Sequence, residues 1–128
     1  YVAVVGGEPS PSKGEVASYL KENSAFHVYS TDDKENGQYA LTRYEVLATN
    51  GRYSLLELQL ATGRKNQIRV HMQDLGHSIA GDRKYGAVSN PLGRLSLHAS
   101  RLRFVHPVTR RDMLFETPVP AGFQRVVR

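Results

Sequence analysis

The stretch that decides the fold is "TRYEVLATNGRYSLLELQLA", residues 42–61. In its first half, apolar and polar side chains alternate, which is the two-residue period of a strand with one buried face. Asn50 and Gly51 then offer the two positive-φ positions of a tight hairpin turn. Leucines at every second position continue the alternation over residues 53–61. The pattern predicts an antiparallel β-hairpin.

A helix is predicted directly after this hairpin. Gly63 ends the second strand, and Asn66 is a candidate N-cap whose side-chain oxygen would accept hydrogen bonds from the first turn. The helix is expected to run through Leu75, with Gly76 as the residue that terminates it. Four side chains at i, i+3, i+4 and i+7 spacing form its apolar stripe, and these are Ile68, His71, Met72 and Leu75. Gln67 and Arg69 are expected off that stripe.

The opening of this helix concentrates positive charge. In "TGRKNQIRVH", residues 62–71, Arg64 and Lys65 precede the first turn and Arg69 projects from it. Free backbone amides and the helix dipole already favour anions at such a position. The spacing therefore indicates a site for an anionic ligand.

Charge is also divided unevenly along the chain. Residues 1–63 carry 5 Lys+Arg and 8 Asp+Glu, whereas residues 64–128 carry 12 and 4, so the net charge changes from −3 to +8. Ten of the later cations are arginines, whose planar fork suits phosphate. A polyanion-binding surface is favoured over a merely solvated arginine-rich face, although charge alone does not separate DNA from RNA.

The remaining elements can be placed around this centre. Strands are predicted at residues 1–5, in "FHVYS" (26–30), in "RLSLHASRLRFVHP" (94–107) and in "DMLFETPVP" (112–120), with "EVASYLKEN" (15–23) helical or extended and "AGFQRVVR" (121–128) a short helix. A change of side-chain parity predicts a β-bulge near Ser100. We expect an α+β fold, with a mixed, mainly antiparallel sheet and one principal helix at 66–75.

Composition excludes several classes of protein. The 128 residues can bury one modest core, so residues 1–128 are expected to form a single unit. There is no cysteine, no stretch long and apolar enough for a membrane span, no helical histidine pair for zinc, and no phosphate-binding P-loop or serine-hydrolase elbow. We expect a cytoplasmic protein without a metal or a membrane partner.

Three motifs, occurring in order, carry a family resemblance. They are "YVAVVGG" (1–7), "LATGRKNQIRVHMQDLGHSIAGDRKYG" (60–86) and "RLSLHASRLRFVHP" (94–107). The chain from Tyr1 to about Pro120 resembles the RluA-type pseudouridine synthases, with Asn66 at a position where that family more often has histidine. The resemblance implies an isomerase that converts uridine to pseudouridine in RNA without cofactor or metal. The RNA would be rRNA or tRNA, so the implied processes are rRNA processing and tRNA modification.

The resemblance also assigns roles to particular residues. Tyr1 corresponds to the active-site tyrosine of the Tyr-x-Ala motif, and Arg69 to the basic residue that pairs with the catalytic aspartate. Without the resemblance, a core aromatic and a surface arginine would be the simpler interpretations. RNA or pocket contacts, or support for them, are expected at Arg64, Lys65, Gln67, Leu97, Arg101 and Arg103, although ordinary core packing explains Leu97 equally well. Asp82 is expected to hold a loop rather than to perform chemistry.

The family's nucleophile is not in this sequence. The resemblance places the essential aspartate in an Arg-Leu-Asp motif upstream of the tyrosine strand, and no such motif occurs here. We therefore expect the chain to be the C-terminal portion, about half, of a synthase catalytic domain, and to be inactive in isolation. Its exposed sheet edge could support dimerisation. The alternative is a noncatalytic RNA-binding module on the same scaffold.

Overall fold

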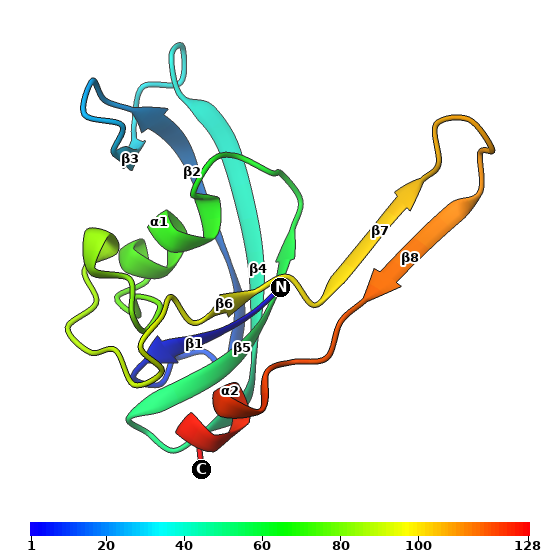
Figure 1. Cartoon of the computed structure of the whole chain (residues 1–128). Helices are drawn as coiled ribbons and strands as arrows, with labels where there is room; N and C mark the ends of the chain where they lie inside the picture. The colour runs from blue at the N-terminus through cyan, green and yellow to red at the C-terminus, as the bar shows by residue number, and fades with distance from the viewer.

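The computed structural model describes residues 1–128, except for the side chain of Phe104. Its main feature is a six-stranded sheet with the strand order β3-β2-β4-β5-β1-β6 (Figure 1). The strands are β1 (Val2–Gly6), β2 (Lys13–Glu22), β3 (Val28–Thr31), β4 (Gln38–Thr49), β5 (Tyr53–Leu60) and β6 (Leu97–His98). The other elements are α1 (Gln67–Asp74), the 3₁₀ turn η1 (Arg83–Tyr85), β7 (Arg101–Val105), β8 (Asp112–Glu116) and α2 (Ala121–Val126).

The predicted α+β class, with a mainly antiparallel sheet and one principal helix, is confirmed. The pairings between named strands are antiparallel in both sheets. Residues 13–22 are extended rather than helical, because β2 pairs with β4 along its length, from Lys13 opposite Glu45 to Leu20 opposite Gln38. No helix of the described part of the chain is both long enough and apolar enough to cross a membrane.

The predicted hairpin is β4–β5, and its turn differs in detail from the prediction. Thr49 pairs with Ser54, so the turn is longer than two residues, and only Gly51 takes a positive φ, of 84°. Asn50 contributes its side chain instead, since Oδ1 accepts hydrogen bonds from the backbone of Arg52 and Tyr53 at 3.0 and 2.8 Å. This use of an asparagine side chain is a common alternative to a positive φ in turns.

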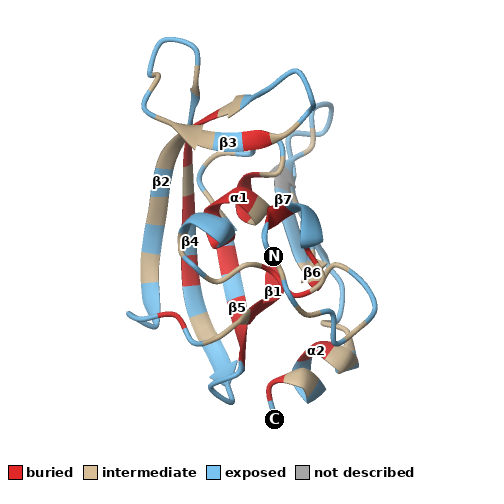
Figure 2. Cartoon of the chain, turned by 90° about the vertical axis from the view of Figure 1, so that its left-hand side faces the viewer, coloured by how far each residue is buried: buried red, intermediate tan, exposed pale blue. Residues whose placement is uncertain are grey.

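Strand β1 lies inside the sheet and is buried on both faces. On one face Ala3 and Val5 join the core formed with Ile68 and Met72 of α1. On the other face Val2 and Val4 pack in a second cluster that includes Phe123 of α2. Figure 2 shows the resulting run of buried residues through the middle of the sheet. The two helices therefore cover opposite faces of the same strand, which explains why residues 2–5 are uniformly apolar.

Helix α1 follows the prediction in extent but not in its capping. Asn66 takes a left-handed conformation, with φ of 56°, and makes no side-chain cap hydrogen bond, so the predicted cap is wrong. Gly76 ends the helix with φ of 87°, as expected. Gln67 is 2% exposed, although it was placed off the buried stripe. Its burial is explained by hydrogen bonds to the neighbouring strand, given below.

One long strand with a β-bulge was predicted over residues 94–107, but the structure has two separate strands there. Leu97 and His98 pair with β1, whereas the chain from Arg101 leaves the sheet and pairs with β8. The parity change at Ser100 therefore marks the departure of a hairpin. Figure 1 shows β7 and β8 projecting away from the six-stranded sheet.

Candidate active-site groove

A groove of about 610 Å³ lies where β1 and β5 meet the base of the β7–β8 hairpin. Tyr1 lies in its lining, together with Glu57–Leu60 of β5 and Arg101–Arg103 of β7. The Tyr1 carbonyl accepts a hydrogen bond from the Leu58 amide at 2.8 Å, so the start of the strand is fixed while the side chain stays 39% exposed. An aromatic ring held in this way offers a stacking surface for a base.

Two predicted RNA-contacting arginines flank the same groove. Arg101 and Arg103 project from β7, where Arg101 pairs with Glu116 at 3.3 Å and Arg103 with Asp112 at 3.6 Å. All four side chains are more than half exposed, so these pairs are weak and each guanidinium can exchange its carboxylate for phosphate. The structure thus brings Tyr1, Arg101 and Arg103 together.

Arg69 is placed differently. It donates from Nε and Nη2 to the two carboxylate oxygens of Asp82, each at 2.9 Å, and its guanidinium lies 4.8 Å from the centre of the Tyr85 ring. The hydrogen bonds that Arg69 donates to Asp82 raise the pKa of Arg69 above its ordinary value. Arg69 is not among the residues that line the groove of Tyr1. Tyr1 and Arg69, the two residues to which the resemblance assigns catalytic roles, therefore do not line the same groove, and the aspartate that Arg69 pairs with in this chain is Asp82.

The other predicted residues at the helix opening divide into exposed and buried ones. Arg64 and Lys65 are exposed, with Arg64 donating to the Tyr39 carbonyl at 3.0 Å and Lys65 pairing with Glu22 at 2.6 Å. Gln67 is buried and cannot reach RNA, so a direct contact is excluded in this conformation. Gln67 instead stabilises the start of helix α1 through hydrogen bonds.

Gln67 begins a chain of hydrogen bonds that continues through Thr42 and His71. Its Oε1 accepts from the Arg64 amide at 3.0 Å, so Nε2 is the donor to the Leu41 carbonyl and to Thr42 Oγ1, both at 3.0 Å. The Thr42 hydroxyl lies 2.7 Å from Nδ1 of His71, and the imidazole tautomer sets which of the two donates. His71 is fully buried, and burial lowers its pKa, which favours a neutral imidazole.

The same chain continues to the end of the helix. His71 Nε2 lies 3.0 Å from Ser18 Oγ, which lies 2.9 Å from Ser30 Oγ, and Ser30 donates to Asp74. We call the path from Gln67 through Thr42, His71, Ser18 and Ser30 to Asp74 the α1 relay. It links α1 to β4, β2 and β3, and so fixes the position of the helix that carries Arg69.

Sequence reasoning did not find the α1 relay. The sequence feature that could have indicated it is a hydroxyl, Thr42, on the buried face of a strand, together with a histidine on the apolar stripe of the helix. Leu97, another predicted site residue, pairs with Ala3 and packs against the core beside α1, which fits the core-packing alternative. Among the described residues, no group of three or more histidine and acidic side chains is placed to hold a metal ion.

The fold is that of part of a pseudouridine synthase domain. The structure of human RNA Pseudouridylate Synthase Domain Containing 1 superposes with a TM-score of 0.79 at 31% identity, covering 93% of this chain and 53% of that one. The sequence profile described as RNA pseudouridylate synthase matches residues 1–74. The chain belongs to this family, which confirms the resemblance stated from the motifs.

Relatives in bacteria agree with this assignment. The uncharacterized RNA pseudouridine synthase YhcT of Bacillus subtilis (strain 168) is 38% identical over 130 residues, covering 100% of this chain and 43% of that protein. The Ribosomal large subunit pseudouridine synthase D of Zymomonas mobilis subsp. mobilis (strain ATCC 31821 / ZM4 / CP4) is 34% identical over 134 residues, covering 97% of this chain and 42% of that protein. The chain thus spans less than half the length of these two relatives.

Proposed function

We propose that the polypeptide containing this chain is an RNA pseudouridine synthase of the cytoplasm. The observation that carries the proposal is Tyr1, presented in a groove that the exposed Arg101 and Arg103 also line, in a chain that belongs to the family. In the proposed reaction the C1′–N1 bond of a uridine breaks, the uracil turns, and C5 bonds to C1′. The hydrogen on C5 is released to solvent and N1 gains a proton, so atoms balance without a cofactor.

In this proposal the groove receives a base extruded from the RNA. Extrusion costs a few kcal/mol of lost stacking, which backbone contacts must offset. Tyr1 stacks on the uracil, and Arg101 and Arg103 bind the flanking phosphates. The nucleophilic aspartate comes from an Arg-Leu-Asp motif outside these 128 residues. Ribosomal RNA is the first substrate to test, because the Zymomonas relative is named for the large ribosomal subunit, and tRNA is the second.

The test is tritium release from RNA labelled at C5 of uridine, with the natural full-length polypeptide. We expect release by the wild type, loss of turnover in Tyr1→Ala, and loss of turnover in Arg69→Ala with a smaller effect on RNA affinity. Wild-type-like turnover in Arg69→Ala would show that Arg69 is not part of the active site.

The second candidate is a noncatalytic RNA-binding module, favoured by the absence of an Arg-Leu-Asp motif from the 128 residues. RNA binding with no tritium release from any rRNA or tRNA substrate, by a full-length polypeptide that also lacks the motif, would select this alternative.

A further inference from the structure

Phe26 stands out on the loop between β2 and β3. It is 68% exposed, more than any other aromatic side chain that the structure describes. Its φ is 60°, in the left-handed region that bulky residues rarely adopt. Burial does not account for this conformation, because the ring faces solvent. A strained residue that gains nothing from burial is a reason to look for a function.

The loop that presents Phe26 is tightly hydrogen-bonded. Asn23 Oδ1 accepts from the amides of Ala25 and His27 at 2.9 and 3.0 Å, and the Asn23 carbonyl accepts from the Phe26 amide at 3.0 Å. Below the loop, the His27 ring stacks on Tyr85 with ring centres 4.8 Å apart. The Phe26 ring is therefore held out from a fixed base.

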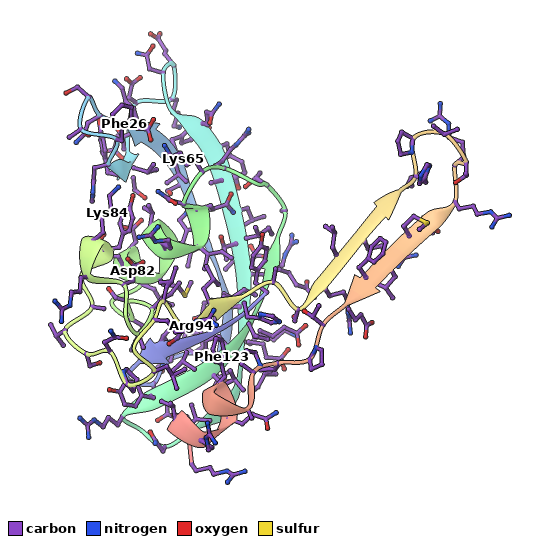
Figure 3. All side chains as sticks on the ribbon, in the orientation of Figure 1. Phe26, Lys65, Asp82, Lys84, Arg94 and Phe123 are labelled. Atoms are coloured by element: carbon purple, nitrogen blue, oxygen red, sulfur yellow. The ribbon has the colours of Figure 1, made fainter. Side chains whose placement is uncertain are left out.

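Two lysines from other elements flank this ring. Lys65, just before α1, places Nζ 5.7 Å from the ring centre of Phe26, and its ion pair with Glu22 holds it there. Lys84 of η1 donates from Nζ to the Phe26 carbonyl at 3.1 Å. Figure 3 shows Phe26, Lys65 and Lys84 gathered on one side of the molecule. Each ammonium has three donors, so both keep protons available for an anion.

We propose that Phe26, Lys65 and Lys84 form a binding site for an unpaired nucleotide of RNA, which we call the Phe26 site. The base stacks on the exposed face of the ring, and the lysines bind the adjacent phosphates. The combination of an aromatic face with two cations suits a nucleotide better than an apolar protein surface, which would have to desolvate both ammonium groups. None of the three residues lines the groove of Tyr1. The proposal rests on the proposed function insofar as the ligand is RNA.

The test compares Phe26→Ala with Phe26→Tyr, which keeps a ring, in the natural full-length polypeptide. The probes are a single-stranded oligoadenylate of about 12 nucleotides, a length that the sites of such proteins cover, and an RNA duplex of equal length. Loss of one stacked base predicts single-strand binding weaker by roughly 5- to 100-fold in Phe26→Ala. Phe26→Tyr should retain affinity, and duplex binding should not change in either variant.

Controls separate this site from folding and from catalysis. Val88→Ala, which changes a fully exposed apolar residue outside the Phe26 site, should leave RNA affinity unchanged, and the urea unfolding midpoint of Phe26→Ala should match the wild type. Unchanged single-strand affinity in Phe26→Ala, or an equal loss in Phe26→Tyr, would overturn the Phe26 site. If the stacking effect is found but no tritium is released, only the proposed enzymatic function fails; if tritium is released without a stacking effect, only the Phe26 site fails.

Discussion

Arg69 and Asp82 form a two-pronged ion pair, in which both carboxylate oxygens accept from one guanidinium at 2.9 Å. The Asp82 side chain is 1% exposed and that of Arg69 is 25% exposed, so the carboxylate depends on this partner for its charge compensation. The pair joins α1 to the loop that leads into η1. Removal of one member leaves the other charge poorly solvated.

We therefore expect Arg69→Ala to lower the free energy of unfolding by about 3 kcal/mol, at the lower end for a buried pair because Arg69 reaches solvent. Arg69→Lys should recover part of the loss, since it restores the charge without the fork. Urea denaturation measures both. Arg43→Ala, in the exposed pair with Glu15, is the matched control and should change little; an equal effect there would contradict this account.

The α1 relay predicts acid sensitivity. Burial lowers the pKa of His71, partly opposed by the charge of Asp74. The unfolded chain therefore takes up a proton at about pH 6.5 that the folded chain does not yet accept. Stability from this group is complete above about pH 6.5 and falls as the pH drops toward the lower folded pKa.

Urea unfolding measured across this range checks the relay. His71→Gln should reduce the slope of stability against pH below about 6.5, whereas His106→Gln on the projecting hairpin should keep it. A wild-type slope in His71→Gln would show that another group is responsible.

Arg101 and Arg103 should contribute to RNA binding through phosphate. Each lost phosphate contact lowers the slope of log K against log salt by about 0.7 for single-stranded RNA. We expect Arg101→Gln and Arg103→Gln each to reduce the slope by about this amount, measured by filter binding with the full-length polypeptide. Arg128→Gln, beyond the end of α2, is the control. Unchanged salt slopes in both Arg101→Gln and Arg103→Gln would show that RNA phosphates do not contact this hairpin.

Gly81 is expected to tolerate no side chain. Its φ is 83°, and a Cβ atom would lie 2.2 Å from the carbonyl oxygen of Arg94. Gly51 has nearly the same φ, 84°, but open space around it. Gly51→Ala should therefore cost only the conformational strain of about 1–2 kcal/mol. Gly81→Ala should cost about 1–3 kcal/mol more, because backbone must move; equal losses in urea unfolding would rule out the steric explanation.

The β7–β8 hairpin should drive self-association of the isolated 128-residue chain. Leu102, Val105 and Leu114 are each more than half exposed on it, and no third strand pairs with it among the described residues. We expect sedimentation equilibrium to show a dimer. Leu102→Lys should give a monomer, and Val88→Lys, outside the hairpin, should remain dimeric. A monomeric wild-type chain would exclude this interface.

Much of the fold could be predicted from local patterns. The alternation in β4 and in the second half of β5, and the helical spacing from Ile68 to Leu75, were sufficient because each of these segments buries one face. The parity change at Ser100 was also visible, but a bulge and a departing hairpin produce the same local pattern. Whether a bulge or a hairpin forms depends on where β8 pairs, and this pairing is a tertiary interaction that the local sequence pattern does not determine.

The site was harder to predict for a similar reason. Arg69 and Asp82 are 13 positions apart, and His71 meets Ser18 across 53 positions. No sequence periodicity relates residues so far apart, so these contacts cannot be predicted from local patterns and are found only in the folded structure. The motifs placed Tyr1 correctly at a strand start, whereas the burial of Gln67 depends on the carbonyl of Leu41 and the hydroxyl of Thr42 on another strand.

Strand β1 is synthesised before either of its neighbours. It pairs with β5, residues 53–60, and with β6, residues 97–98. During translation, β1 therefore cannot form these two pairings until about fifty further residues have emerged from the ribosome. Long-range pairing of this kind is slow, and it leaves an unpaired, aggregation-prone strand edge accessible to other nascent chains. We expect the β4–β5 hairpin, which is local, to form first and to be the template onto which β1 docks.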